Sequence, residues 1–241
     1  MKNILIFSVL VSFCFTGCLP VFDKTKVKGS GTVTTEQRAV LPFDKIVVGG
    51  AFSVYLLQGD TESVEVEIDD NLQQYVEVRN EGSKLVLDIR DHVNFVKTTG
   101  NNVYITLKDI DLFDVSGVCK VKTSGSLNCD HLTFKVSGVA NGELEVYCNK
   151  LVVRLSGVAN IELRGETTEL DVNQSGVGKF NAMNLIAAKV AVVNSGVGSV
   201  SVYATQELSM NNSGVGSITY SGDAEIKTVN SSGIGKITKA K

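Results

Sequence analysis

Apolar and polar residues alternate along most of the chain after residue 30, and glycine-containing turns interrupt this alternation at regular intervals. The tripeptide Ser-Gly-Val, or Ser-Gly-Ile in the last copy, occurs seven times, with spacings of 18 to 21 residues. The Ser-Gly pairs are Ser116, Gly117, Ser137, Gly138, Ser156, Gly157, Ser175, Gly176, Ser195, Gly196, Ser213, Gly214, Ser232 and Gly233. A period of two is typical of strands with one buried face. The pattern therefore predicts strands joined by tight turns.

Each repeat of about 19 residues contains a strand, the tight turn, a second strand and a looser turn. Apolar residues stand five and three positions before the serine and two positions after it, as Leu170, Val172 and Val177 do around Ser175. One such unit cannot bury its apolar face alone, whereas units stacked about 4.8 Å apart bury it continuously. Residues 112–241 are thus predicted to form an all-β parallel solenoid with two main sheets. The turn glycine would provide either a positive φ or the absence of a side chain between coils.

The residue just before the serine changes from apolar to polar in the later repeats, where Gln174, Asn194 and Asn212 occupy it. Stacked amide side chains can form a hydrogen-bonded ladder along neighbouring strands. Exposure to solvent beside the turn explains the same residues equally well. The sequence leaves both interpretations open.

The first half of the chain has longer and less regular strands. We assign residues 31–111 to an N-terminal β region that leads into the solenoid and covers its first coil. The segment Gly49-Gly50-Ala51-Phe52 is interpreted as a divergent turn of the repeated kind.

The first residues have the features of an export signal. Residues 1–17 contain Lys2 and then an apolar run that is too short to span a membrane as a helix. Gly17 precedes Cys18, as in the cleavage site of bacterial lipoproteins, so Cys18 is the predicted lipidation site and residues 18–30 are the predicted tether. The alternative is an ordinary secretory signal with an incidental cysteine. Both send the protein out of the cytoplasm.

Two cysteines are predicted to be neighbours in adjacent coils. Cys129 and Cys148 each lie eight residues before a repeat serine, so stacking would place their Cα atoms about 4.8 Å apart. That separation lies within the range for a disulfide. Cys129 and Cys148 are therefore a candidate disulfide, with stacked free thiols as the alternative.

The chain contains little that predicts catalysis. The formal net charge is −3 and no basic stripe is present, which argues against a nucleic-acid partner. The repeats carry no recurring acid, and the two histidines, His92 and His131, are far apart. The cluster Asp109, Asp111 and Asp114 is interpreted as a solvated turn and not a calcium site. We predict no catalytic residue, no metal and no cofactor.

Long stacked faces suit extended ligands such as a glycan or a protein segment. Tyr147, Tyr203 and Tyr220 lie near the looser turns and are candidate ligand-contacting aromatics, unless they close the apolar core at its corner. Two other functions stay open. One is a periplasmic structural or assembly protein, which would form a homo-oligomer, and the other is a polysaccharide-degrading enzyme.

The sequence resembles the head GIN domain family of auto-transporter adhesins. The residues that carry the resemblance are Phe43-Asp44-Lys45-Ile46, Gly49-Gly50-Ala51-Phe52-Ser53-Val54 and the Ser-Gly-Val-Gly series. The resemblance implies a right-handed β-helix similar to pectin-lyase-like folds, with Gly-rich turns joining two sheets. It also implies an envelope lipoprotein with a role in adhesion. An outer-membrane anchor is expected, facing either the cell surface or the periplasm.

Overall fold

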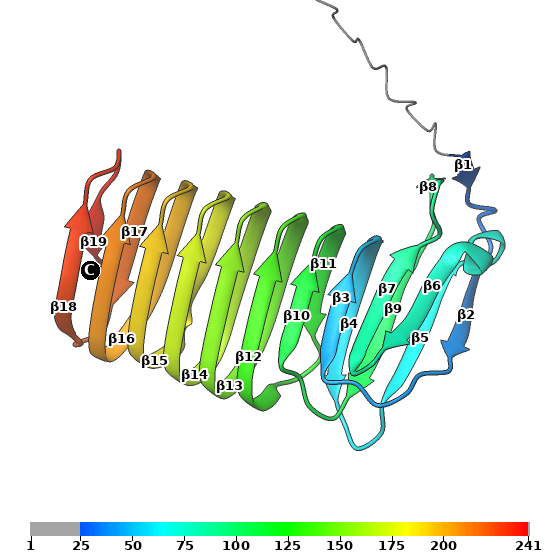
Figure 1. Cartoon of the computed structure of the whole chain (residues 1–241), viewed down its shortest axis with the longest axis horizontal. Coiled ribbons are helices and arrows are strands. Elements are labelled where there is room, and N and C mark those ends of the chain that lie inside the picture. Colours follow the sequence, from blue (N-terminus) through cyan, green and yellow to red (C-terminus); the bar gives the residue numbers. More distant parts are fainter. Residues whose placement is uncertain (1–24, 241) are drawn as a thin grey trace, which may run out of the picture.

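The molecule is an elongated stack of β coils with a more complex β layer at one end. The structure, a computed structural model, describes residues 25–240. The predicted signal segment and Cys18 lie outside these residues. Strands β10 to β19 follow one another along the stack, and β2 to β9 form its other end (Figure 1).

The regular part is the predicted parallel solenoid, with about seven turns and two sheets. Its strands are β10 (Leu112–Val115), β11 (Val118–Thr123), β12 (Leu127–Val136), β13 (Val139–Leu155), β14 (Val158–Gln174), β15 (Val177–Asn194), β16 (Val197–Asn212), β17 (Val215–Ser221), β18 (Glu225–Ser231) and β19 (Ile237–Lys239). All pairings between these coils are parallel. Strands β13 to β16 continue through the looser turn, so each contributes to both sheets.

Each tight turn is fixed by hydrogen bonds to the preceding coil. The N–H groups of Ser156 and Gly157 both donate to the carbonyl of Val136, at 2.9 and 3.1 Å, and the N–H of Val158 donates to Gly138 at 2.9 Å. A Cβ atom on Gly157 would lie 2.0 Å from the carbonyl oxygen of Gly138. Gly157 does not have a positive φ. Of the two explanations for this glycine, the close approach of the coils is therefore the correct one.

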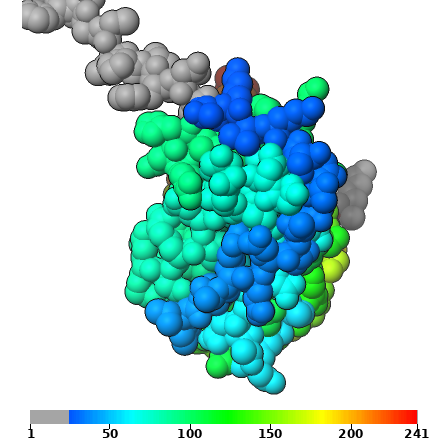
Figure 2. Space-filling model, turned by 90° about the vertical axis from the view of Figure 1, so that its right-hand side faces the viewer, coloured from blue at the N-terminus to red at the C-terminus, as the bar shows by residue number. Residues whose placement is uncertain are grey.

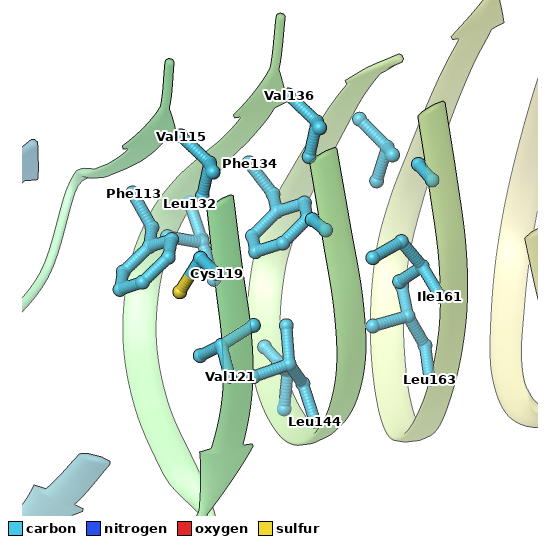
Figure 3. Packing of buried hydrophobic residues seen from close by; sticks show 14 of the residues in the cluster. Phe113, Val115, Cys119, Val121, Leu132, Phe134, Val136, Leu144, Ile161 and Leu163 are labelled. Carbon is cyan, nitrogen blue, oxygen red and sulfur yellow. The ribbon is translucent and has the colours of Figure 1, made fainter. Parts of the chain in front are cut away.

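The core is a set of side-chain rows that continue from coil to coil between the two sheets. Phe113 and Phe134 stack with ring centroids 5.6 Å apart, and Leu132 lies beside them, whereas Leu144 and Leu163 lie farther along in neighbouring coils (Figure 3). Equivalent apolar residues repeat along the stack, so each coil covers the apolar surface of the next.

The amides before the later turns are part of this interior. Gln174, Asn194 and Asn212 are at most 1 % exposed, and Asn194 Nδ2 donates to Asn212 Oδ1 at 3.0 Å. Asn212 Nδ2 donates in turn to the carbonyl of Gly216 at 2.8 Å. Solvent exposure is therefore the wrong interpretation for these three residues, and the ladder is confirmed between Asn194 and Asn212.

The residues two positions after the serines differ from the expectation that they are buried. All seven lie on the outer surface. Ile234 is 77 % exposed, and 41 to 53 % of each valine is exposed: Val118, Val139, Val158, Val177, Val197 and Val215. The turn resets the alternation so that the next residue, such as Ala159 after Val158, points inward. This outer line of side chains is called the valine row below.

Two further coils extend the solenoid into the first half of the chain. One is β3 (Lys45–Val48) with β4 (Ala51–Gln58), and the other is β7 (Lys84–Ile89) with β9 (Asn101–Leu107). Strand β3 pairs in parallel with β7 and β10, and β4 pairs in parallel with β9 and β11. The N–H of Val118 donates to the carbonyl of Gly50 at 3.0 Å. Gly49-Gly50 therefore forms the divergent turn that the sequence predicts.

Antiparallel strands cover the end of the stack. Strand β2 (Val33–Arg38) pairs with β5 (Ser63–Asp69), β5 pairs with β9, and β6 (Val76–Glu81) pairs with β7, all in antiparallel orientation. A 3-10 helix, η1 (Asp70–Tyr75), joins β5 to β6. Seen from this end, the blue and cyan segments lie across the stack (Figure 2).

The segment before this cap is also partly structured. Strand β1 (Thr25–Lys28), inside the range predicted as a tether, pairs in parallel with β8 (Val93–Val96) as a separate two-stranded sheet. One continuous hydrophobic cluster joins the capped end to the regular coils. The first coils and the solenoid consequently share their core.

Candidate ligand-binding face

One outer face of the solenoid carries two parallel lines of polar side chains. Register pairing aligns Lys120, Asn141, Asn160 and Lys179, which we call the lysine–asparagine row. The same pairing aligns Lys122, Glu143, Glu162 and Asn181, which we call the glutamate row. The two rows line a furrow of about 440 Å³, with the backbone at Gly142 in its lining. The valine row borders the lysine–asparagine row on the same face.

The charges in the furrow are not equivalent. Lys122 Nζ lies 3.0 Å from Glu143 Oε2, and the hydrogen bond from Lys122 holds the pKa of that carboxyl below its usual value. Lys120 and Lys179 make no ion pair with any residue between 25 and 240. They stand at the two ends of their row, about 14 Å apart over three coil spacings. Their ammonium groups are therefore available to a ligand that spans the two asparagines.

The glutamate row continues into the first half of the chain as two tyrosines. Lys122 pairs in register with Tyr55, and Tyr55 with Tyr104. The two rings stack with centroids 5.1 Å apart and planes inclined by 18°. Stacking covers one face of each ring, and Tyr104 remains 38 % exposed. Burial raises the pKa of Tyr104 above its ordinary value.

The tyrosines predicted from the sequence lie elsewhere and do not meet. Tyr147 and Tyr203 occupy one outer line near the looser turns, where Glu166 and Ile186 separate them. Tyr220 continues an inward row after Val202 and packs against the core. For Tyr220, closing the core is the interpretation that the geometry supports.

The predicted cysteine neighbours do face each other. Cys129 and Cys148 are register partners in β12 and β13, and both thiols are free. The predicted serines and glycines of the repeats form the tight turns, where their backbone N–H groups bond the preceding coil.

The described residues contain no group of three His, Cys, Asp or Glu side chains placed to hold a metal ion. Within the furrow, Glu143 and Glu162 are adjacent register partners. A general acid at neutral pH needs a raised pKa. The lowered pKa of Glu143 is the opposite of that requirement, which disfavours it as the proton donor of a glycosidase.

Comparison with known proteins identifies the family. Residues 42–224 match the model of the family described as "Putative auto-transporter adhesin, head GIN domain". The chain belongs to this family. No curated protein matches the sequence. The head GIN assignment agrees with the resemblance based on the Phe43 segment and the Ser-Gly-Val-Gly series.

Solved structures of other bacterial proteins have the same architecture. A protein of Bacteroides fragilis, described as a putative adhesin, is 27% identical, with a TM-score of 0.86 over 89% of this chain and 100% of that chain. A protein of Parabacteroides distasonis, described as a putative lipid binding protein, is 24% identical, with a TM-score of 0.72 over 90% of this chain and 100% of that chain. The second likeness concerns the fold alone.

Within residues 25–240, no helix is long and apolar enough to cross a membrane.

Proposed function

We propose that this head GIN protein is a non-catalytic envelope lipoprotein that binds an extended ligand along the furrow, and that the ligand is a glycan. The observation that carries the proposal is the lysine–asparagine row, which repeats hydrogen-bonding groups at the coil spacing between two unpaired ammonium groups. The family's description as adhesins supports a binding role.

The chemistry of the face favours a glycan over a protein segment. Sugar chains combine many hydroxyl groups with apolar ring faces. Asn141 and Asn160 offer amide donors and acceptors to hydroxyl groups, and the valine row offers an apolar strip to the rings. A stable protein interface has a fully buried apolar centre with a polar rim, whereas here the polar rows form the centre of the face.

The length of the face explains why the ligand would be extended. Successive coils present equivalent groups about 4.8 Å apart, so a polymer that runs along the stack meets the same chemistry repeatedly. Each contact is weak, and several of them along one chain act together. A single monosaccharide would use only one or two of these positions.

The test is the double substitution Asn141→Ala and Asn160→Ala, measured by binding to immobilised glycans from bacterial envelopes and host mucus. We expect affinity to fall at least about tenfold, because two sets of hydrogen bonds to the ligand are lost. The matched control is Asn173→Ala with Asn211→Ala, two exposed asparagines on the other sheet, which should leave binding unchanged. Equal losses in the two variants, or no binding by the unmodified protein to any glycan, would refute the proposal.

A further inference from the structure

A second feature of the surface lies away from the furrow, at the looser turn. Cys129 of β12 and Cys148 of β13 are register partners on neighbouring coils. Both side chains are half-buried against the corner of the core. They line a hollow of about 310 Å³, together with Tyr147 and Glu166. Small molecules therefore have access to the sulfur atoms.

The geometry points to a thiol–disulfide exchange site at which Cys148 attacks a small disulfide and Cys129 resolves the product into an intramolecular Cys129–Cys148 bridge. Neighbouring strands lie about 4.8 Å apart, which is inside the Cα range that disulfides occupy. The inference is independent of the furrow and of its ligand.

The surroundings of the two sulfurs decide which one attacks. Cys148 Sγ lies 3.5 Å from Thr167 Oγ1, whose hydroxyl also lies within hydrogen-bonding distance of the carbonyls of Asn149 and Glu169. The carboxylates of Asp109 and Asp111 disfavour a negative charge on Cys129, and that of Asp130 disfavours one on Cys148. Because two acids act on Cys129 and the Thr167 hydroxyl contacts Cys148, we place the single negative charge of the pair on Cys148.

The pKa values follow the same asymmetry. The hydrogen bond from Cys129 is the main cause that lowers the pKa of Cys148 to about 7, against the opposing effect of burial. The same hydrogen bond, with burial, raises the pKa of Cys129. Because the thiolate is the nucleophilic form, Cys148 is the sulfur that reacts near neutral pH.

The exchange proceeds in two balanced steps. The Cys148 thiolate attacks one sulfur of the small disulfide, breaks its S–S bond and expels one thiolate, which takes a proton from water. Cys129 then loses its proton to solvent and attacks Cys148 Sγ, and the second thiolate leaves. Two protein thiols are oxidised, and one small disulfide is reduced to two thiols.

Cys119 provides an internal comparison. It is 2 % exposed, and burial raises its pKa to about 12. Its register partners are Phe52 and Ala140, so the neighbouring coils offer it no second sulfur. Cys119 should stay reduced while the protein is folded.

The experiment treats the reduced full-length protein with oxidised glutathione at pH 7 and identifies the products by peptide mass spectrometry. We expect a Cys129–Cys148 crosslink and an unmodified Cys119. In the Cys129→Ser variant, which keeps a hydrogen-bond donor, Cys148 should accumulate the glutathione adduct. In the Cys148→Ser variant, Cys129 should react about five- to tenfold more slowly than Cys148 does in the Cys129→Ser variant. The larger thiolate fraction of Cys148 outweighs its lower intrinsic nucleophilicity.

A pH series separates this site from an ordinary pair of exposed thiols. The reaction rate of Cys148 in the Cys129→Ser variant should rise with pH and level off above about pH 7 to 8, as its thiol ionises. A rate that keeps rising to pH 9, or equal rates for the two single variants, would overturn the assignment of Cys148. Adducts on both sulfurs without a crosslink would overturn the exchange site itself.

Discussion

At the residue scale, the amide ladder shows what a buried polar group contributes to this fold. Asn194 and Asn212 are fully buried and joined by a side-chain hydrogen bond, and Asn212 also bonds the backbone of Gly216. Buried donors without partners cost about 1–3 kcal/mol each. The ladder therefore holds the register of the later coils as well as filling their interior.

Replacing Asn212 with alanine tests this role. The substitution leaves the amide of Asn194 and the carbonyl of Gly216 without their partners, so we expect a loss of about 1–3 kcal/mol in the free energy of unfolding. Urea denaturation measures the loss. The control is Asn211→Ala on the same strand, where the side chain is exposed and the change should stay within about 0.5 kcal/mol. Equal effects at the two positions would contradict a structural ladder.

The direction of these side chains could not be settled from the sequence because the alternation is reset at every glycine turn. The same reset placed the valine row outside, against the expectation of burial. No sequence signal marks the furrow residues either, since Lys120 and Asn141 are residue types found at any solvent-facing strand position. Only the register between coils shows that they line up.

At the element scale, the coil is the repeating structural unit of the molecule. The coils containing β13, β14 and β15 have nearly the same sequence of inward and outward positions. The spacing of the serines predicted these coils, and the Gly49-Gly50 turn extended them into the first half. The antiparallel cap was not predictable, because β2 and β5 pair across about 30 residues without any repeated motif.

Removing one whole coil should leave a folded, shorter protein. Deletion of residues 156–174 joins Leu155 to Ser175 and preserves every inward row, so only one interface between coils is lost. Circular dichroism should retain the β signal, and small-angle scattering should show a particle shorter by about 4.8 Å. The control removes residues 156–164, which destroys the turn and shifts the rows. Folding of this control, or failure of the whole-coil deletion, would contradict the coil as the independent unit.

At the scale of the whole molecule, the proposed function depends on which side of the membrane the protein faces. Cys18 precedes the capped end, so a lipid there would place the cap towards the membrane and the open coils away from it. Protease treatment of intact cells of the native host, compared with the Cys18→Ala variant, tests the arrangement. We expect the protein to be removed from intact cells and the variant to leave the membrane fraction. Protection until the outer membrane is broken would favour a periplasmic binding or scaffold protein.

The small sheet of β1 and β8 has a mechanical consequence for a protein held at one end. Tension that arrives through the chain before Thr25 acts first on β1, which is four residues long and mostly exposed. Beyond it, Gly31 N–H donates to the buried carboxylate of Asp69, and Asn71 accepts from Ser30 N–H. We therefore expect β1 to separate from β8 under a weak force. The segment before the folded part would then be longer by a few residues. The hydrogen bond from Gly31 to the Asp69 carboxylate should then stop the extension before the coils of the solenoid are disturbed.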